Sequence, residues 1–168
     1  AMVEDMFDRS QDRMHLDTVF NILSERCCAL LESIIGADNE RRRLVTEYTK
    51  TRFGYEVTRT GVEFAQYLRD EGFHIIAVPE EYQLRYGINF LNMGDSRILA
   101  VHEPSKLLFE ADPAFAGTIT YVRYDGITGM YGAGHCSTQV LRRHTHAPTH
   151  AAADAAAAGD GECGAPAE

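Results

Sequence analysis

Two segments of the sequence carry side chains whose types could act on an electron-poor carbon. In the first, Cys136 follows the glycine-rich stretch Gly132-Ala133-Gly134-His135. Glycine permits sharp backbone turns and the close approach of a ligand, so Gly134 is a candidate substrate-binding position. The thiolate of a cysteine is a strong nucleophile, and we predict that Cys136 is a catalytic residue. The same residues also allow a second interpretation, a small buried cysteine that follows a turn.

The other segment, Met14-His15-Leu16-Asp17-Thr18-Val19-Phe20, places an imidazole two residues before a carboxylate. We expect a strand here, on which His15 and Asp17 share one face. The imidazole could transfer a proton, and the carboxylate could hold a guanidinium through two parallel N–H bonds. The alternative is that the two side chains only pair with each other or lie on a solvated edge, because His-x-Asp is a weak pattern.

The elements that must position these residues alternate between strand and helix. The expected strands are 16–23, 26–31, 54–60 (a turn or short strand), 74–78, 88–93, 97–102, 118–122 and 138–141, and the expected helices are 39–50, 62–70 and 105–110. A hairpin, then a helix, then a strand occur twice, with LDTVFNILSERCCALLE and INFLNMGDSRILAVHE as the two hairpins. Repeats of one such unit usually close into a pseudosymmetric array. We therefore predict an α/β fold built from strand-strand-helix-strand modules.

The composition indicates one globular domain, residues 1–143, followed by a low-complexity tail, residues 144–168. The tail begins with histidines in the string HTHAPTH and continues mainly with Ala, Gly, Asp and Pro. Such a segment cannot bury enough apolar surface to offset the entropy of ordering it, so we predict that the tail is disordered.

The charge and the apolar pattern narrow the classes of partner. A formal net charge of −9 argues against nucleic acid, which is bound by clustered Lys and Arg. No apolar run approaches the roughly 20 residues of a membrane helix, and the acidic start lacks the features of a signal peptide. Cys27 and Cys28 are adjacent and would point to opposite faces of a strand, which disfavours a shared disulfide or metal site. We predict a reduced, cytoplasmic protein that binds neither nucleic acid nor membrane.

The two chemical segments together resemble a known family. MHLDTVF is similar to the histidine motif of the arginine deiminases, and GHCSTQ resembles the nucleophile motif of deiminases and amidinotransferases. The repeated module resembles the five-bladed α/β propeller of that superfamily, the penteins. The resemblance covers residues 10–143 and implies about half of the full propeller.

The resemblance also implies roles for individual residues. Cys136 would attack the central carbon of a guanidinium, and His15 would act first as general acid and then as general base through a covalent thiouronium intermediate. Asp17 would hold the guanidinium N–H groups, and Asn89 in Gly87-Ile88-Asn89 would contact the substrate. No metal and no organic cofactor are implied. The expected partners are a small guanidino substrate and, through unpaired strand edges, further copies in a homo-oligomer.

Two departures from the family pattern shape what we expect of this chain. Two carboxylate motifs of the family, F-x-R-D and E-G-G-D, do not occur in the sequence. We therefore expect the C-terminal catalytic half of a longer hydrolase, inactive by itself. Tyr131 stands where an arginine is expected, which opens the choice to agmatine-like, methylated or protein-linked guanidines. An amidinotransferase with the same chemistry and a non-catalytic truncated paralogue or scaffold are the alternatives.

Overall fold

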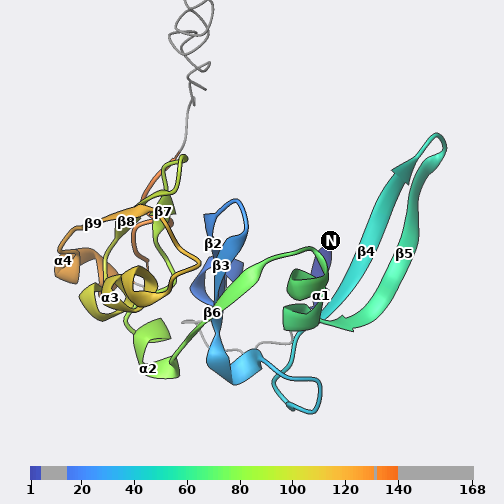
Figure 1. Cartoon of the computed structure of the whole chain (residues 1–168), viewed down its shortest axis with the longest axis horizontal. Helices are drawn as coiled ribbons and strands as arrows, with labels where there is room; N and C mark the ends of the chain where they lie inside the picture. Colours follow the sequence, from blue (N-terminus) through green and yellow to red (C-terminus); the bar gives the residue numbers. More distant parts are fainter. Residues whose placement is uncertain (5–14, 131, 140–168) are drawn as a thin grey trace, which may run out of the picture. The chain divides into compact units, whose positions relative to one another are not determined.

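The computed structural model describes residues 1–4, 15–130 and 132–139, and the compact unit considered below comprises Ala1–Thr138 (Figure 1). The strands are β1 (Met2–Glu4), β2 (Phe20–Ser24), β3 (Cys27–Leu31), β4 (Leu44–Thr51), β5 (Gly54–Glu63), β6 (His74–Val78), β7 (Leu91–Asn92), β8 (Arg97–Ala100) and β9 (Thr118–Tyr121). The helices are α1 (Phe64–Asp70), α2 (Glu80–Gln83), α3 (Glu103–Ala111) and α4 (Asp125–Thr128), and Leu16–Thr18 and Glu32–Ile34 form 3₁₀ turns. None of the helices in these ranges has the length and apolar character needed to span a bilayer.

The strand-strand-helix-strand repeat predicted from the sequence is confirmed. In the first module, β2 pairs antiparallel with β3, and β3 pairs parallel with β6 after the chain has passed through α1. In the second module, β7 pairs antiparallel with β8, and β8 pairs parallel with β9 after α3. The sheets of the two modules, β2-β3-β6 and β7-β8-β9, therefore have the same strand order and directions, and β1, β4 and β5 form a third sheet. This confirms an α/β fold that contains one unit used twice.

The helix predicted over residues 39–50 is wrong, because β4 occupies most of this range. The charged residues suggested a helix, but Val45, Tyr48 and several threonines favour an extended chain. The strand pairs with β5 from Leu44 opposite Glu63 to Thr51 opposite Gly54. Pairing across the β4–β5 hairpin thus outweighed the helical preference of the charged residues.

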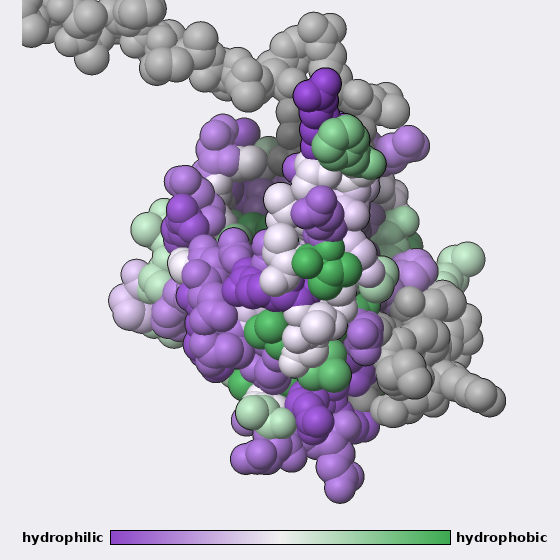
Figure 2. All heavy atoms as spheres, turned by 90° about the vertical axis from the view of Figure 1, so that its right-hand side faces the viewer, coloured by the Kyte–Doolittle hydropathy of each residue, from purple (hydrophilic) through white to green (hydrophobic). Residues whose placement is uncertain are grey.

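Strands β4 and β5 form a long two-stranded arm that projects beyond the sheet of the first module (Figure 1). Phe53 at its tip is 92% exposed and Tyr55 is 70% exposed. Figure 2 shows apolar side chains among polar ones on the face of the molecule that carries this arm. Exposed apolar surface of this kind favours association, and the homo-oligomer stays a prediction.

Smaller differences concern the ends of the other elements. The strand expected at 88–93 is reduced to β7, and the turn-rich stretch before Cys136 contains α4. A strand was expected at 138–141, but Thr138 is irregular. The last two residues of this range lie outside the described residues. The predicted tail, 144–168, also lies outside them.

Two asparagines hold the first strands of the two modules together. The amide of Asn21 in β2 donates two hydrogen bonds of 2.9 Å to backbone carbonyls just before β7. In return, the amide of Asn92 in β7 donates to two carbonyls of β2, at 2.8 and 3.4 Å. This reciprocal pairing brings the segments that precede β2 and β7 close together, and these segments carry Asp17 and Asn89.

Candidate active site

His15 and Asp17 lie at a 3₁₀ turn, and the prediction of a strand beginning at Leu16 is wrong. The hydroxyl and the backbone N–H of Thr18 both donate to the His15 carbonyl, at 2.6 and 3.1 Å, which closes the chain into the Leu16–Thr18 turn. Thr18 is buried whereas Leu16 is 41% exposed, although both would share one face of a strand. The regular strand begins only at Phe20.

The nucleophile segment is anchored by a buried asparagine. Asn89 has no exposed surface, and its Oδ1 accepts hydrogen bonds from the backbone N–H groups of His135 and Cys136, at 3.2 and 3.3 Å. Its Nδ2 donates to Sγ of Cys136 at 3.2 Å. Cys136 itself is exposed, which rules out the interpretation of a small buried cysteine. The substrate contact expected of Asn89 stays a prediction, since the contacts of its amide described here are with the nucleophile segment.

Gly134 lies in a closely packed position. A Cβ atom at this position would lie 3.3 Å from the carbonyl oxygen of Asn89 and 3.3 Å from a methyl carbon of Val101, closer than most such contacts. The absence of a side chain therefore lets the nucleophile segment lie against the buried part of the second module. A direct contact between Gly134 and a substrate stays a prediction.

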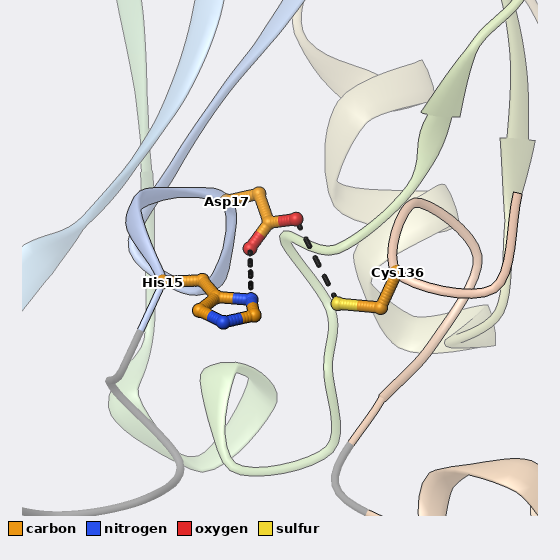
Figure 3. A group of neighbouring side chains, drawn as sticks. All are labelled: His15, Asp17 and Cys136. Carbon is orange, nitrogen blue, oxygen red and sulfur yellow. Dashed lines mark hydrogen bonds and ion pairs between the residues drawn. The ribbon is translucent and has the colours of Figure 1, made fainter. Parts of the chain in front are cut away.

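The carboxylate of Asp17 lies between the other two predicted catalytic side chains (Figure 3). Its Oδ2 accepts a hydrogen bond from Sγ of Cys136 at 3.7 Å, and its Oδ1 lies 4.0 Å from Nδ1 of His15. The second distance fits an ion pair but is too long for a hydrogen bond. Oδ1 is buried and has no hydrogen-bond partner among the described residues, so its capacity to accept a hydrogen bond is unused there. The tertiary structure thus joins segments that are 119 positions apart.

Sequence reasoning missed the contact made by His135. Its Nδ1 lies 2.7 Å from Oδ2 of Asp17, the shortest contact of that carboxylate among the described residues. Because an ionised carboxylate only accepts hydrogen bonds, Nδ1 must carry the proton. The adjacency of His135 to Cys136 was the available signal, but nothing in the sequence connects it with Asp17.

An open pocket of about 450 Å³ lies beside this group. It is lined by His15, Leu16, Asp17, Phe20, Asn21, Ile22, Asn92 and His135. The lining combines one carboxylate with apolar, imidazole and amide side chains, which suits a planar organic cation better than a strongly hydrated one. The described surface can therefore accept a guanidinium group at Asp17.

The side chains of His15, Asp17 and Cys136 could also coordinate a metal ion. One nitrogen of His15, one oxygen of Asp17 and the sulfur of Cys136 lie within 4.8 Å of one another. Nitrogen, oxygen and thiolate ligands at such spacing are compatible with zinc. The expectation that the chemistry needs no metal stays a prediction.

We expect iodoacetamide to alkylate Cys136 much faster than Cys27 or Cys28 near neutral pH. Burial raises the pKa of Cys27 to about 11, helped by Asp112, and that of Cys28 to about 12, helped by Cys27. A raised pKa leaves little thiolate at pH 7, and the reaction of both residues should increase as the pH rises. Peptide mapping by mass spectrometry measures the three rates separately. Faster labelling of Cys27 or Cys28 would contradict the assignment of Cys136 as the nucleophile.

Comparison with known proteins agrees with the geometry. A family model described as arginine deiminase matches residues 1–143. An arginine deiminase of Halobacterium salinarum (strain ATCC 29341 / DSM 671 / R1) is 26% identical over 167 residues, covering 83% of this chain and 32% of that relative. The chain thus spans about a third of the length of the curated relative. The family predicted from the two motifs is confirmed, and the chain belongs to the arginine deiminase family, within the pentein superfamily.

Proposed function

We propose that this chain supplies the nucleophile, the acid/base and one substrate carboxylate of a hydrolase that cleaves a carbon–nitrogen bond of a guanidino group. Membership of the arginine deiminase family supports this reaction class. The observation that carries the proposal is the position of the Asp17 carboxylate, with one oxygen toward His15 and the other toward Sγ of Cys136. A guanidinium bound to Asp17 would lie within reach of both.

The first step forms a covalent intermediate. The thiolate of Cys136 attacks the central guanidinium carbon, and a carbon–sulfur bond forms in a tetrahedral adduct. Protonated His15 then gives its proton to one of the nitrogens. The bond from carbon to that nitrogen breaks, ammonia or an amine leaves, and a thiouronium group remains on Cys136.

The second step is hydrolysis of that intermediate. Neutral His15 accepts a proton from a water molecule, whose oxygen attacks the thiouronium carbon. The carbon–sulfur bond breaks, which restores the thiolate of Cys136 and releases a ureido product. Water supplies the oxygen atom and the nitrogen leaves as ammonia or an amine, so the reaction balances as a hydrolysis.

We further propose that the two modules belong to a five-bladed propeller whose other blades complete the site. The shared strand order of the two sheets supports this arrangement. The curated relative is about three times as long as the matched part, which leaves room for additional modules and for further carboxylates. The cytoplasmic location also remains a proposal.

A pair of alkylating agents of similar shape tests whether Asp17 recognises a planar cation. Chloroacetamidine carries an amidinium group that resembles a guanidinium, whereas chloroacetamide is neutral. The rate of each agent at Cys136 is divided by its rate with free glutathione. The corrected rate of chloroacetamidine divided by that of chloroacetamide gives a ratio that does not depend on how much thiolate is present. We expect this ratio to fall by about five- to tenfold in Asp17→Asn, because charge-assisted hydrogen bonds to a carboxylate are lost.

The control for this test is Asp112→Asn. Asp112 also accepts from a histidine, His74, at 3.1 Å, and its side chain is 23% exposed, close to the 17% of Asp17. Both ratios are measured in proteins that also carry the Cys163→Ser substitution, so that the tail has no thiol. An unchanged ratio in Asp17→Asn, or an equal decrease in Asp112→Asn, would contradict the proposed recognition of a guanidinium at this site.

A further inference from the structure

We propose that His135 is a gating residue, whose imidazole occupies the guanidinium position on Asp17 and must be displaced by the substrate. This inference rests on the proposed function, in which Asp17 binds the guanidinium. Its basis is the 2.7 Å hydrogen bond from Nδ1 of His135 to Oδ2 of Asp17, the same oxygen that lies 3.7 Å from Sγ of Cys136.

The two oxygens of the Asp17 carboxylate differ in their partners and in their exposure. A guanidinium is held best when two of its N–H groups donate in parallel to both oxygens of a carboxylate. Oδ1 of Asp17 has no hydrogen-bond partner among the described residues, whereas Oδ2 accepts from His135. Because Oδ1 is buried and lies 4.0 Å from Nδ1 of His15, a guanidinium that binds this carboxylate has to take Oδ2 from the imidazole of His135.

The surroundings of His135 allow its ring to move while its backbone stays in place. The backbone N–H of His135 donates to the buried Oδ1 of Asn89, which fixes the main chain next to Cys136. The side chain of His135 is 53% exposed and lines the open pocket. The ring can therefore rotate toward solvent without disturbing the hydrogen bonds that Asn89 makes to the nucleophile segment.

A purely supporting role for His135 would have the opposite consequence. If the imidazole only oriented Asp17, its removal would loosen the carboxylate and weaken the binding of a cation. If the imidazole competes with the cation, its removal should strengthen binding. The sign of the change thus separates the two roles.

The test uses the full chain with Cys163→Ser and the ratio of chloroacetamidine to chloroacetamide alkylation at Cys136. We expect His135→Ala to raise this ratio about fivefold, because one competing hydrogen bond to a charged group is removed. His135→Gln, which retains a shorter donor, should give an intermediate value. Thermal unfolding monitored by circular dichroism shows that each variant is folded before its rates are compared.

His74→Ala is the matched control, because His74 also donates to a carboxylate, that of Asp112, and its side chain is 49% exposed. Its ratio should equal that of the parent chain. A ratio that stays constant or falls in His135→Ala, while Asp17→Asn lowers it, overturns the gating role and leaves the proposed function intact. A ratio that Asp17→Asn does not change overturns the proposed function itself.

Discussion

The 168-residue chain on its own is expected to release no detectable ammonia or methylamine from arginine, agmatine or methylarginine. A guanidinium must be held at both edges while a thiolate approaches its carbon, and Asp17 provides one carboxylate at one edge. Losing a single oriented polar group commonly slows catalysis by about 10²–10³-fold. The loss of two such groups should leave turnover near the uncatalysed background.

Two acidic residues that could have supplied the second carboxylate are engaged elsewhere. Glu63 caps α1, where its oxygens accept from the backbone N–H groups of Gln66 at 2.7 Å and Gly36 at 3.3 Å. Asp125 pairs with Arg123, and its side chain is 70% exposed. Glu63 is therefore held by the start of α1, and Asp125 takes part in an ion pair at the surface.

An enzyme-coupled ammonia assay at high chain concentration, supported by mass spectrometry of the ureido product, measures this activity. Cys136→Ala provides the background rate. Release of ammonia that depends on Cys136 would contradict the requirement for additional residues, and Glu63→Gln and Asp125→Asn would then identify the carboxylate responsible.

The second large effect is expected in the protein encoded by the longest reading frame that contains this sequence. There we expect hydrolysis of a guanidino compound, and Cys136→Ala should abolish it because no covalent intermediate can form. His15→Ala should reduce it by about 10²–10⁴-fold, the usual contribution of a general acid–base residue. Product release is measured over a panel of free, methylated and protein-linked guanidines.

The intermediate distinguishes the roles of the two residues. Rapid acid quenching and intact-mass measurement should show a thiouronium adduct on the parent protein and none on Cys136→Ala. Cys163→Ser and His74→Ala are the controls and should keep full activity. Loss of activity in both controls, or full activity in Cys136→Ala, would contradict the proposed mechanism. Transfer of the amidino group to an added amine, in preference to water, would identify an amidinotransferase instead.

Parts of the fold could be predicted because local pattern and tertiary pairing agree there. The strand His74–Val78 was predicted with its observed bounds, and α1 was predicted within two residues of its start. Gly72, with a φ of +82°, follows the end of α1, and Gly72 and Pro79 flank the strand, so clear turn signals mark these ends. The range 39–50 was predicted incorrectly because its charged residues were given more weight than Val45, Tyr48 and the threonines, whose extended conformation is stabilised by pairing with β5.

The sequence by itself determined the chemical types present at the site, the repeated module and the family. Cysteine, histidine and aspartate in MHLDTVF and GHCSTQ identify a thiol, an imidazole and a carboxylate suited to a guanidinium. Only the tertiary structure decided how these groups meet. The Thr18 hydrogen bonds turn Asp17 toward Cys136, the buried Asn89 fixes the nucleophile, and His135 occupies one oxygen of Asp17. The contacts of Asn89 with Cys136 and of His135 with Asp17 join residues far apart in the chain. They depend on how the chain packs, because spacing along a sequence does not encode distances between distant segments.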